Sequence, residues 1–352
     1  MDFSVMASYL PLYWKAMLLT LKIGWMGILI AIALGFLCAA ARRYKVPVLS
    51  QLSGAYIELF RNTPLLVQLF FLYFGLPKLG FSIQAEACGV QVSVHAPYYV
   101  NLASPDPEKR EASCEYIVRS AERAKWLGGS RVVVHAGAYQ KQDRELALRA
   151  CREGLLACCR RLDAMGLTGI RLCPETMGRP GQIGGLAETL ALCLADERLL
   201  PCVDFAHLHA LSGGGLKTRA DFARVLDEAE NTLGLERARQ MHIHFSAIEF
   251  TDKGEKRHRT FSEEGFGPAF SDLAPELVQR HYRPVIICEC NGTQAEDAAR
   301  MRDMLLEAER AAQYGPLPAE GTENRPENTK CTEKSGKNVL NRENNFAKRL
   351  NI

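Results

Sequence analysis

VQVSVH (residues 90–95) and RVVVH (131–135) are the first of six short apolar runs that each end in a side chain able to bind a metal ion. The other four are IRLCPE (170–175), LPCVD (200–204), MHIH (241–244) and VIICE (285–289). Their endpoints recur about every 40 residues, with helix-like sequence between most of them. A strand–helix unit repeated at this period is typical of a parallel α/β barrel, whose strands all end at one mouth. The sequence therefore predicts an α/β, TIM-barrel-like fold with the six endpoints gathered at that mouth.

The distribution of histidines supports a metal site at these strand ends. Seven of the eight lie on or just after them: His95, His135, His207, His209, His242, His244 and His258. Imidazoles mixed with Glu and Asp suit Zn²⁺, with Mn²⁺ or Fe²⁺ as alternatives. Because one tetrahedral zinc ion needs only four ligands, we expect two or three ions sharing a bridging carboxylate. We interpret His209 and His281 as structural or surface residues. For His244, a ligand role and a supporting role stay equally open.

Charge and cysteine content limit the partners and the compartment. The 352-residue chain has a net charge of +3 at pH 7, yet residues 84–314 hold 29 Lys and Arg against 33 Asp and Glu. A nucleic acid would therefore need a local basic rim and bound cations, not a basic field over the whole domain. The twelve cysteines fall largely in expected strands and helices with no CxxC pair, which favours buried free thiols in a reducing compartment.

Three helices between the strands can be placed from their end signals. Asp106-Pro107 is a good N-cap and first-turn pair and predicts a helix that runs through Trp126. Two further helices are predicted over residues 143–165 and 218–233, and each is followed by a glycine.

The N-terminal residues 1–83 differ from the rest of the chain. Residues 18–41 are apolar except for Lys22, which is long enough to span a bilayer, and the basic pair Arg42 and Arg43 that follows should stay cytoplasmic. A second run, 65–75, reaches spanning length only if it extends to residue 83.

Seven motifs in residues 84–314 resemble the endonuclease IV family of apurinic/apyrimidinic endonucleases, a branch of the xylose-isomerase-like TIM barrels. In order, they are SVHAPYYVNL, VVVHAG, PETMG, CVDFAHLHA, MHIHFS, GEKRH and ICECNG. The resemblance implies a DNA repair hydrolase in which three zinc ions cleave the phosphodiester 5′ to an abasic site.

The resemblance also implies a role for individual residues. One ion would be held by His95 and His135 and joined through Glu175 to a second ion, which is held also by Asp204, His242 and Glu289. The third ion would be held by His207 and His258. Glu175 and Glu289 are the predicted catalytic residues, and Tyr98 and Tyr99 would bind DNA at the gap left by the missing base. Where the family usually has an Asp ligand this chain has Lys256, so the neighbouring Glu255 is the candidate replacement.

The domain organisation expected from these features has three parts. Residues 56–80 (YIELFRNTPLLVQLFFLYFGLPKLG) resemble the start of a polar amino acid ABC transporter permease, so 1–83 is interpreted as a membrane segment. Residues 84–314 would form the barrel, with about six of the eight strand–helix units, and residues 315–352 a disordered tail. Such a fusion would be tethered to the plasma membrane through residues 18–41 with its barrel in the cytoplasm. If the N-terminal segment is an artefact of fusion, the barrel would be simply cytoplasmic.

Two alternatives to the nuclease remain open. A sugar isomerase or epimerase of the same superfamily would use Glu175, Asp204, His242 and Glu289 alone, without the four extra histidines. A permease fragment would explain only residues 1–83. An ABC ATPase partner is not expected, because no further run of 18 apolar residues follows residue 83.

Overall fold

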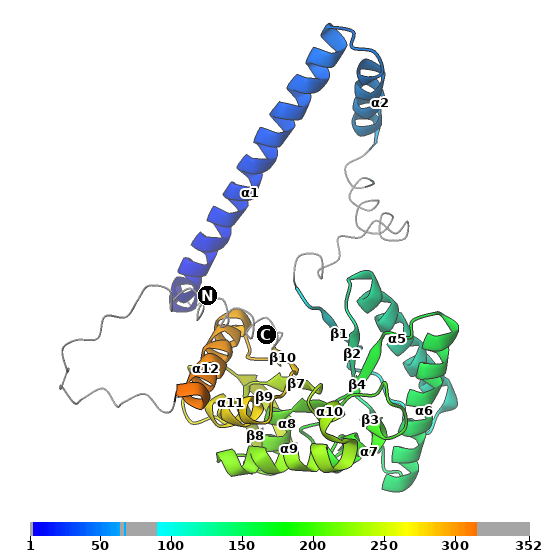
Figure 1. Ribbon diagram of the computed structural model, residues 1–352, viewed down its shortest axis with the longest axis vertical. Coiled ribbons are helices and arrows are strands. Elements are labelled where there is room, and N and C mark those ends of the chain that lie inside the picture. The colour runs from blue at the N-terminus through cyan, green and yellow to red at the C-terminus, as the bar shows by residue number, and fades with distance from the viewer. Residues whose placement is uncertain (1–2, 64–66, 68–89, 315–352) are drawn as a thin grey trace, which may run out of the picture. The chain divides into compact units, whose positions relative to one another are not determined.

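The computed structural model describes residues 3–63, 67 and 90–314 of the chain (Figure 1). The chain divides into two compact units, Met1–Ser82 and Ile83–Ile352. The predicted second apolar run and the predicted tail lie outside the described residues, except for residue 67.

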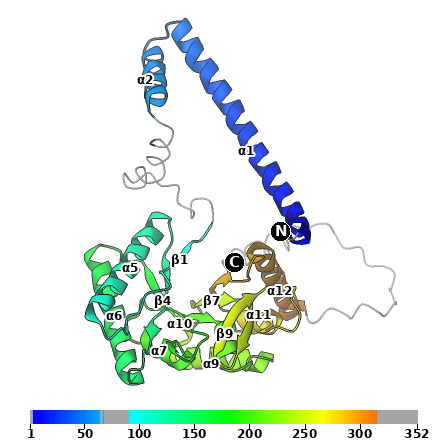
Figure 2. The ribbon, with the colours of Figure 1, turned by 180° about the vertical axis from the view of Figure 1, so that it is seen from behind.

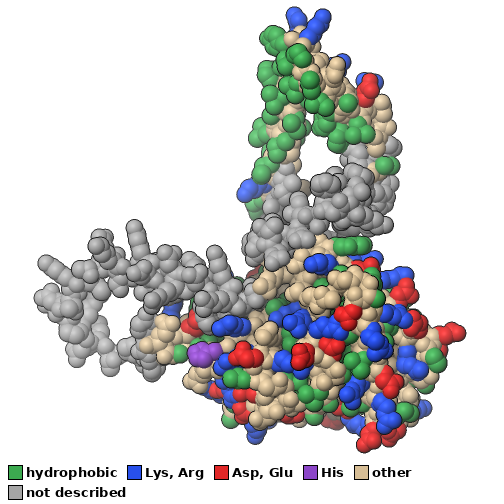
Figure 3. Space-filling model, turned by 45° about the vertical axis from the view of Figure 1, so that its right-hand side comes forward, with side chains coloured by type: hydrophobic (Ala, Val, Ile, Leu, Met, Phe, Trp, Pro, Cys, Tyr) green, Lys and Arg blue, Asp and Glu red, His purple; other side chains and the backbone are tan. Residues whose placement is uncertain are grey.

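The described residues of unit 1 form two helices, α1 (Phe3–Arg43) and α2 (Leu49–Asn62). Within α1, Thr20–Arg43 is long and apolar enough to cross a membrane, with a mean hydropathy of 2.3. Its large apolar side chains are exposed, Trp25 by 63% and Phe36 by 74%. Figure 3 shows hydrophobic side chains gathered along this unit, in contrast to the interspersed charges on the visible face of unit 2. This is the surface expected of a helix that packs against lipid or another apolar partner.

The part of unit 2 that the structure describes is built on six parallel strands that follow one another in chain order. They are β1 (Ser93–His95), β2 (Arg131–Val134), β4 (Arg171–Pro174), β6 (Cys202–Asp204), β7 (His242–Phe245) and β10 (Val285–Cys288). Ladders join β1-β2-β4 and β6-β7-β10, and parallel bridges from Leu172 to Leu199 and from Glu175 to Cys202 connect the two sets. The predicted TIM-barrel-like α/β architecture is confirmed. Within the described residues, β1 pairs with β2 alone and β10 pairs with β7 alone, so these two strands end the row.

Helices cover the outside of the strands (Figures 1 and 2). They are α5 (Pro107–Trp126), α6 (Arg144–Ala164), α7 (Leu186–Cys193), α8 (Phe205–Leu211), α9 (Arg219–Leu233), α10 (Leu235–Ala238), α11 (Phe270–Gln279) and α12 (Gln294–Tyr314). The three helices predicted from end signals are confirmed as α5, α6 and α9. The Asp106 carboxylate caps α5 by accepting from the Glu108 backbone N–H, and Gly234 ends α9 with a φ of 80°.

Two short antiparallel strand pairs lie at the carboxyl ends of the strands. One pairs β3 (Gly137–Ala138) with β5 (Gln182–Ile183), and the other pairs β8 (Ala247–Thr251) with β9 (Gly254–Arg259). The β8–β9 pair carries a register shift at Glu249/Phe250, and β9 lies over the strand ends with Glu255 and His258 in the lining of the mouth.

Alternating strand residues separate the helix layer from the barrel interior. On β2, Val132 and Val134 pack with α5 and α6, whereas Val133 joins Cys173, Leu200 and Cys202 in a separate buried cluster. Successive strand side chains point to opposite faces, so this cluster is the interior layer below the mouth. All ten cysteines that the structure describes are free thiols, and nine of them are buried, as predicted.

Candidate metal centre at the mouth of the barrel

The predicted strand endpoints gather at the carboxyl ends of the strands, around a cavity of about 540 Å³. His95 ends β1, Asp204 ends β6, and His135, Glu175 and Glu289 directly follow β2, β4 and β10. Parallel strands place their carboxyl ends at the same edge, which explains why residues almost 200 positions apart meet here.

Glu175 is the centre of this arrangement. Its side chain is 1% exposed, and its Oε2 lies 3.0 Å from Nε2 of both His95 and His135. Its other oxygen, Oε1, lies 2.7 Å from Nδ1 of His244, and Nδ1 of His244 is 3.1 Å from Oε1 of Glu289. The two oxygens of one carboxylate therefore face two different sets of nitrogen and oxygen donors. This is the geometry that a carboxylate bridging two metal ions requires.

On β7, it is His244 that lies with Glu175 and Glu289, whereas His242 was the ligand predicted on this strand. Strand register gives the reason, because Asp204 pairs with His244 across β6 and β7, whereas Cys202 pairs with His242. His242 therefore lies one layer deeper, inside the barrel. Ligand atoms of Glu175, Asp204, His244 and Glu289 all lie within 4.8 Å of one another.

Asp204 and His207 are positioned by the turn from β6 into α8. Asp204 is the N-cap of α8, and its Oδ1 accepts a hydrogen bond from the His207 backbone N–H at 2.8 Å. Nδ1 of His207 lies 2.9 Å from the Thr176 carbonyl oxygen. His258 on β9 completes a third set of donors with these two residues, and its Nδ1 is 2.7 Å from Oγ of Ser246.

Glu255, and not Lys256, faces the cavity from β9. Oε2 of Glu255 lies 3.4 Å from Nε2 of His207, while the Lys256 ammonium pairs with Glu249 on the neighbouring strand. A carboxylate is thus present beside the third set of donors, although Lys256 stands where the resembled family usually has an Asp ligand.

The electrostatics of the mouth are those of carboxylates and imidazoles buried together. Burial alone would raise the pKa of Glu175, but the charge of His244 and hydrogen bonds from three imidazoles outweigh it and hold the pKa well below its usual range. Burial lowers the pKa of His244 and His207, but nearby carboxylates outweigh it and raise both to about 9. The imidazoles of His244 and His207 therefore hold protons that a metal ion would have to displace.

One buried oxygen supports the fit of cations to this mouth. Oδ2 of Asp204 is buried and accepts no hydrogen bond from the described residues. Leaving a buried carboxylate oxygen unsatisfied is costly, and an ion at this position would satisfy it. The donor set of imidazole nitrogens and carboxylate oxygens suits a divalent ion such as Zn²⁺, Mn²⁺ or Fe²⁺.

The two predicted DNA-binding tyrosines follow β1 and diverge. Tyr98 is 74% exposed and lines the cavity, with its ring centroid 4.8 Å from that of His95. Tyr99 is 68% exposed but packs edge-on against Tyr116 of α5, at 5.0 Å between centroids. Arg179 also lines the cavity and is half exposed, a residue for which the sequence offered no signal beyond its place after PETMG.

The two histidines that were predicted not to bind metal, His209 and His281, lie apart from the mouth. Nδ1 of His209 accepts a hydrogen bond from the Leu216 backbone N–H at 3.2 Å, and His281 follows α11 with a φ of 56°. Among the described residues, neither belongs to a group of metal-type donors.

Comparison with known proteins assigns the chain to a family. The model of the xylose isomerase-like TIM barrel matches residues 48–308. This chain belongs to that family. The match begins inside the segment predicted to be membrane-associated, and the resemblance to endonuclease IV is confirmed.

Relatives and solved structures agree on the fold and differ in name. An uncharacterized protein, MJ0133 of Methanocaldococcus jannaschii, is 35% identical over 56% of this chain and 70% of its own length. A probable endonuclease 4 of Staphylococcus carnosus is 30% identical over 53% of this chain and 61% of its own length, so the chain spans less than two thirds of that relative. The crystal structure of a D-tagatose 3-epimerase-like protein has a TM-score of 0.51 at 21% identity, covering 68% of this chain and 82% of that one.

Proposed function

We propose that the barrel is a zinc-dependent endonuclease that cleaves DNA on the 5′ side of abasic sites. The observation that carries the proposal is the carboxylate of Glu175, shared between a His95–His135 pair on one oxygen and His244 on the other. With the third set around His207 and His258, the mouth offers donors for more than one ion. The endonuclease 4 relative favours the same reaction class.

The residues of the mouth divide the work in this proposal. Two or three zinc ions, held by the sets centred on Glu175 and Asp204, would supply an activated water and offset the charge of the attacked phosphate. Glu175 and Glu289, as ligands, would hold these ions in position at that phosphate. Without bound cations, the carboxylates at the mouth would repel DNA.

Recognition of the missing base falls to Tyr98. An abasic nucleotide leaves a gap in the stack of bases, and an exposed aromatic ring beside the mouth can enter such a gap and stack on its neighbours. Arg179, half exposed at the same rim, offers a guanidinium to a flanking phosphate.

A sugar epimerase is the second candidate. Glu175, Asp204, His244 and Glu289 alone form a four-residue donor set that suits the single ion of such an enzyme. Donors from His95, His135, His207 and His258 exceed that need, and they favour the nuclease.

A nicking assay separates the two. Full-length, zinc-loaded protein is incubated with a duplex oligonucleotide carrying one abasic site, in buffer without magnesium, and in parallel with ketoses and aldoses. The nuclease proposal expects strand cleavage 5′ to the abasic position and an unchanged sugar pool. Sugar interconversion without any strand cleavage would overturn it in favour of the epimerase.

We also propose that α1 tethers the protein to the plasma membrane, with the barrel of residues 84–314 on the cytoplasmic side. The apolar stretch Thr20–Arg43 and its terminal Arg42 and Arg43 support this. Cell fractionation tests it: the full chain should stay with membranes after alkaline carbonate washing. Full recovery in the wash would exclude the tether.

A further inference from the structure

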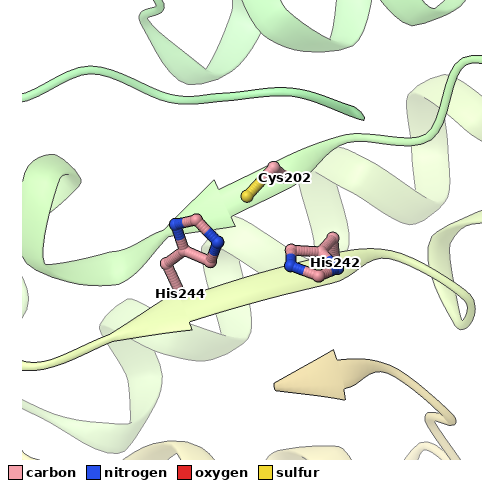
Figure 4. Close-up of side chains that lie close together, drawn as sticks. All are labelled: Cys202, His242 and His244. Carbon is pink, nitrogen blue, oxygen red and sulfur yellow. The ribbon is translucent and has the colours of Figure 1, made fainter. Parts of the chain in front are cut away.

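A second group of metal-type side chains lies inside the barrel, one layer below the mouth. Cys202 on β6 and His242 on β7 are direct cross-strand partners, and His244 follows two residues later on β7. The sulfur of Cys202 and one ring nitrogen of each histidine all lie within 4.8 Å of one another. Figure 4 shows the thiol and the two imidazoles together, on the adjacent strands β6 and β7.

His242 has no partner that explains its presence there. It is 0% exposed, and both Nδ1 and Nε2 lack a hydrogen bond to any described residue. An unpaired buried polar group costs about 1–3 kcal/mol, so a ligand that used one of these nitrogens would stabilise the fold. The neighbouring interior residues Val133 and Leu200 are apolar, which leaves few partners for a bridging water.

We propose that Cys202, His242 and His244 bind one divalent ion of the zinc type, one layer below the mouth, with His244 as the residue common to both layers. A thiolate and two imidazoles are a donor set that zinc favours. Tetrahedral bonds to sulfur and nitrogen place the donor atoms about 3.3–3.8 Å apart, so side-chain shifts of about 1 Å close the site. On binding, the Cys202 thiol and Nε2 of His244 each release a proton to solvent, and bonds to the metal replace the S–H and N–H bonds.

Two carboxylates lie close enough to the inner site to favour a cation. The carboxylates of Glu175 and Asp204, one layer above, attract a cation toward Cys202.

His244 connects the two layers. Its Nδ1 faces Glu175 and Glu289 at the mouth, so its Nε2 is the nitrogen left for the inner ion. The inner site does not depend on the proposed nuclease activity, because Cys202 and His242 are not among the donors of the mouth.

Cobalt substitution tests the inner site with a signal that the mouth cannot produce. Full-length protein is stripped of metal and titrated with Co²⁺, which occupies zinc positions and gives a near-ultraviolet charge-transfer band when a thiolate is bound. We expect the band to grow to the amplitude of one cobalt–sulfur bond per chain. Cobalt-saturated wild-type protein without this band would overturn the proposal.

Three variants assign the band. Cys202→Ser should abolish it, whereas Cys173→Ser, which alters a thiol of the same interior cluster, should leave it unchanged. His242→Phe should raise the half-saturating Co²⁺ concentration by about tenfold or more. A band that survives in Cys202→Ser and disappears in Cys173→Ser would refute the assignment.

Alkylation of the wild-type protein gives a second readout that needs no variant. In moderate urea, Zn²⁺ in excess over all of the proposed sites should slow iodoacetamide labelling of Cys202 at least about tenfold relative to Cys173, measured by peptide mass spectrometry. Equal labelling of the two thiols would count against the site. Loss of nicking with the charge-transfer band retained would refute only the proposed nuclease, and nicking without the band would refute only the inner site.

Discussion

Replacing Glu175 by Gln is the sharpest perturbation of the mouth. The substitution keeps the size of the side chain but removes the negative charge and exchanges one oxygen for an NH₂ group that cannot bind a metal ion. Oε2 faces His95 and His135, while Oε1 faces His244. The set of donors on the side of the new NH₂ group therefore loses a ligand, and the set on the other side keeps an oxygen that no longer carries negative charge. The fold should persist, since the side chain fills the same volume.

The expected loss of metal follows from these contacts. Changing a residue that only supports a ligand typically costs 10–100-fold in affinity, so loss of a direct, shared ligand should cost about 100-fold or more, or about 2.7 kcal/mol. In the metal-free protein, loss of the Glu175 charge should also lower the pKa of His244 from about 9.

Elemental analysis after dialysis against a weak chelator measures the first effect, and an NMR titration of the imidazole measures the second. Glu276→Gln is the matched control, because Glu276 is also a buried carboxylate but pairs with Arg219 and Arg280 away from the mouth. Its metal content should equal that of the wild type. A Glu175→Gln protein that keeps all of its metal would refute the bridging role.

Three further predictions concern single features of the mouth. Glu255→Gln should lower the number of ions bound per chain, whereas Lys256→Gln should not, as counted by elemental analysis. The reverse result would mean that position 256, and not Glu255, contributes to the third set of donors. Tyr98→Ala should weaken binding to an abasic duplex by about 1–3 kcal/mol, with a smaller effect for Tyr99→Ala, in fluorescence anisotropy; equal losses would exclude a special role for Tyr98. Because the pKa of His207 is about 9, zinc must displace its proton at lower pH. Apparent zinc affinity in chelator competition should therefore rise from pH 7 to 9 by up to about tenfold per unit and per proton, then level off, and a flat profile would contradict this.

The sequence predicted the strands, and with them most of the site, because apolar runs that end in ligand residues carry both signals at once. All six run endpoints, as well as His207 and His258, lie in the donor sets, because each sits at a strand end or in the segment that follows it. The endpoint of the MHIH run is His244, whereas the family resemblance implied His242 as the ligand on that strand. Asp204 is the endpoint of its run, and it pairs with His244 on the adjacent strand, so the endpoint rule gives the histidine that lies at the mouth.

Other features depend on contacts that a sequence does not show. The register shift in β8–β9 and the pairing of Lys256 with Glu249 decide that Glu255 faces the cavity, and both arise between residues on separate strands. The pairing of Tyr99 with Tyr116 depends on where α5 packs. The meeting of Cys202 and His242 depends on strand register, which local patterns specify poorly when a strand is apolar on both faces.

Anomalous scattering at the zinc edge, from crystals of the zinc-loaded protein, distinguishes a multinuclear site from a mononuclear one. We expect separate peaks on the two sides of the Glu175 carboxylate, one beside His95 and His135 and another beside Asp204 and His244. A single peak in the mouth, bound by Asp204 and Glu289 without His95 or His135, would contradict the multinuclear site and favour the epimerase.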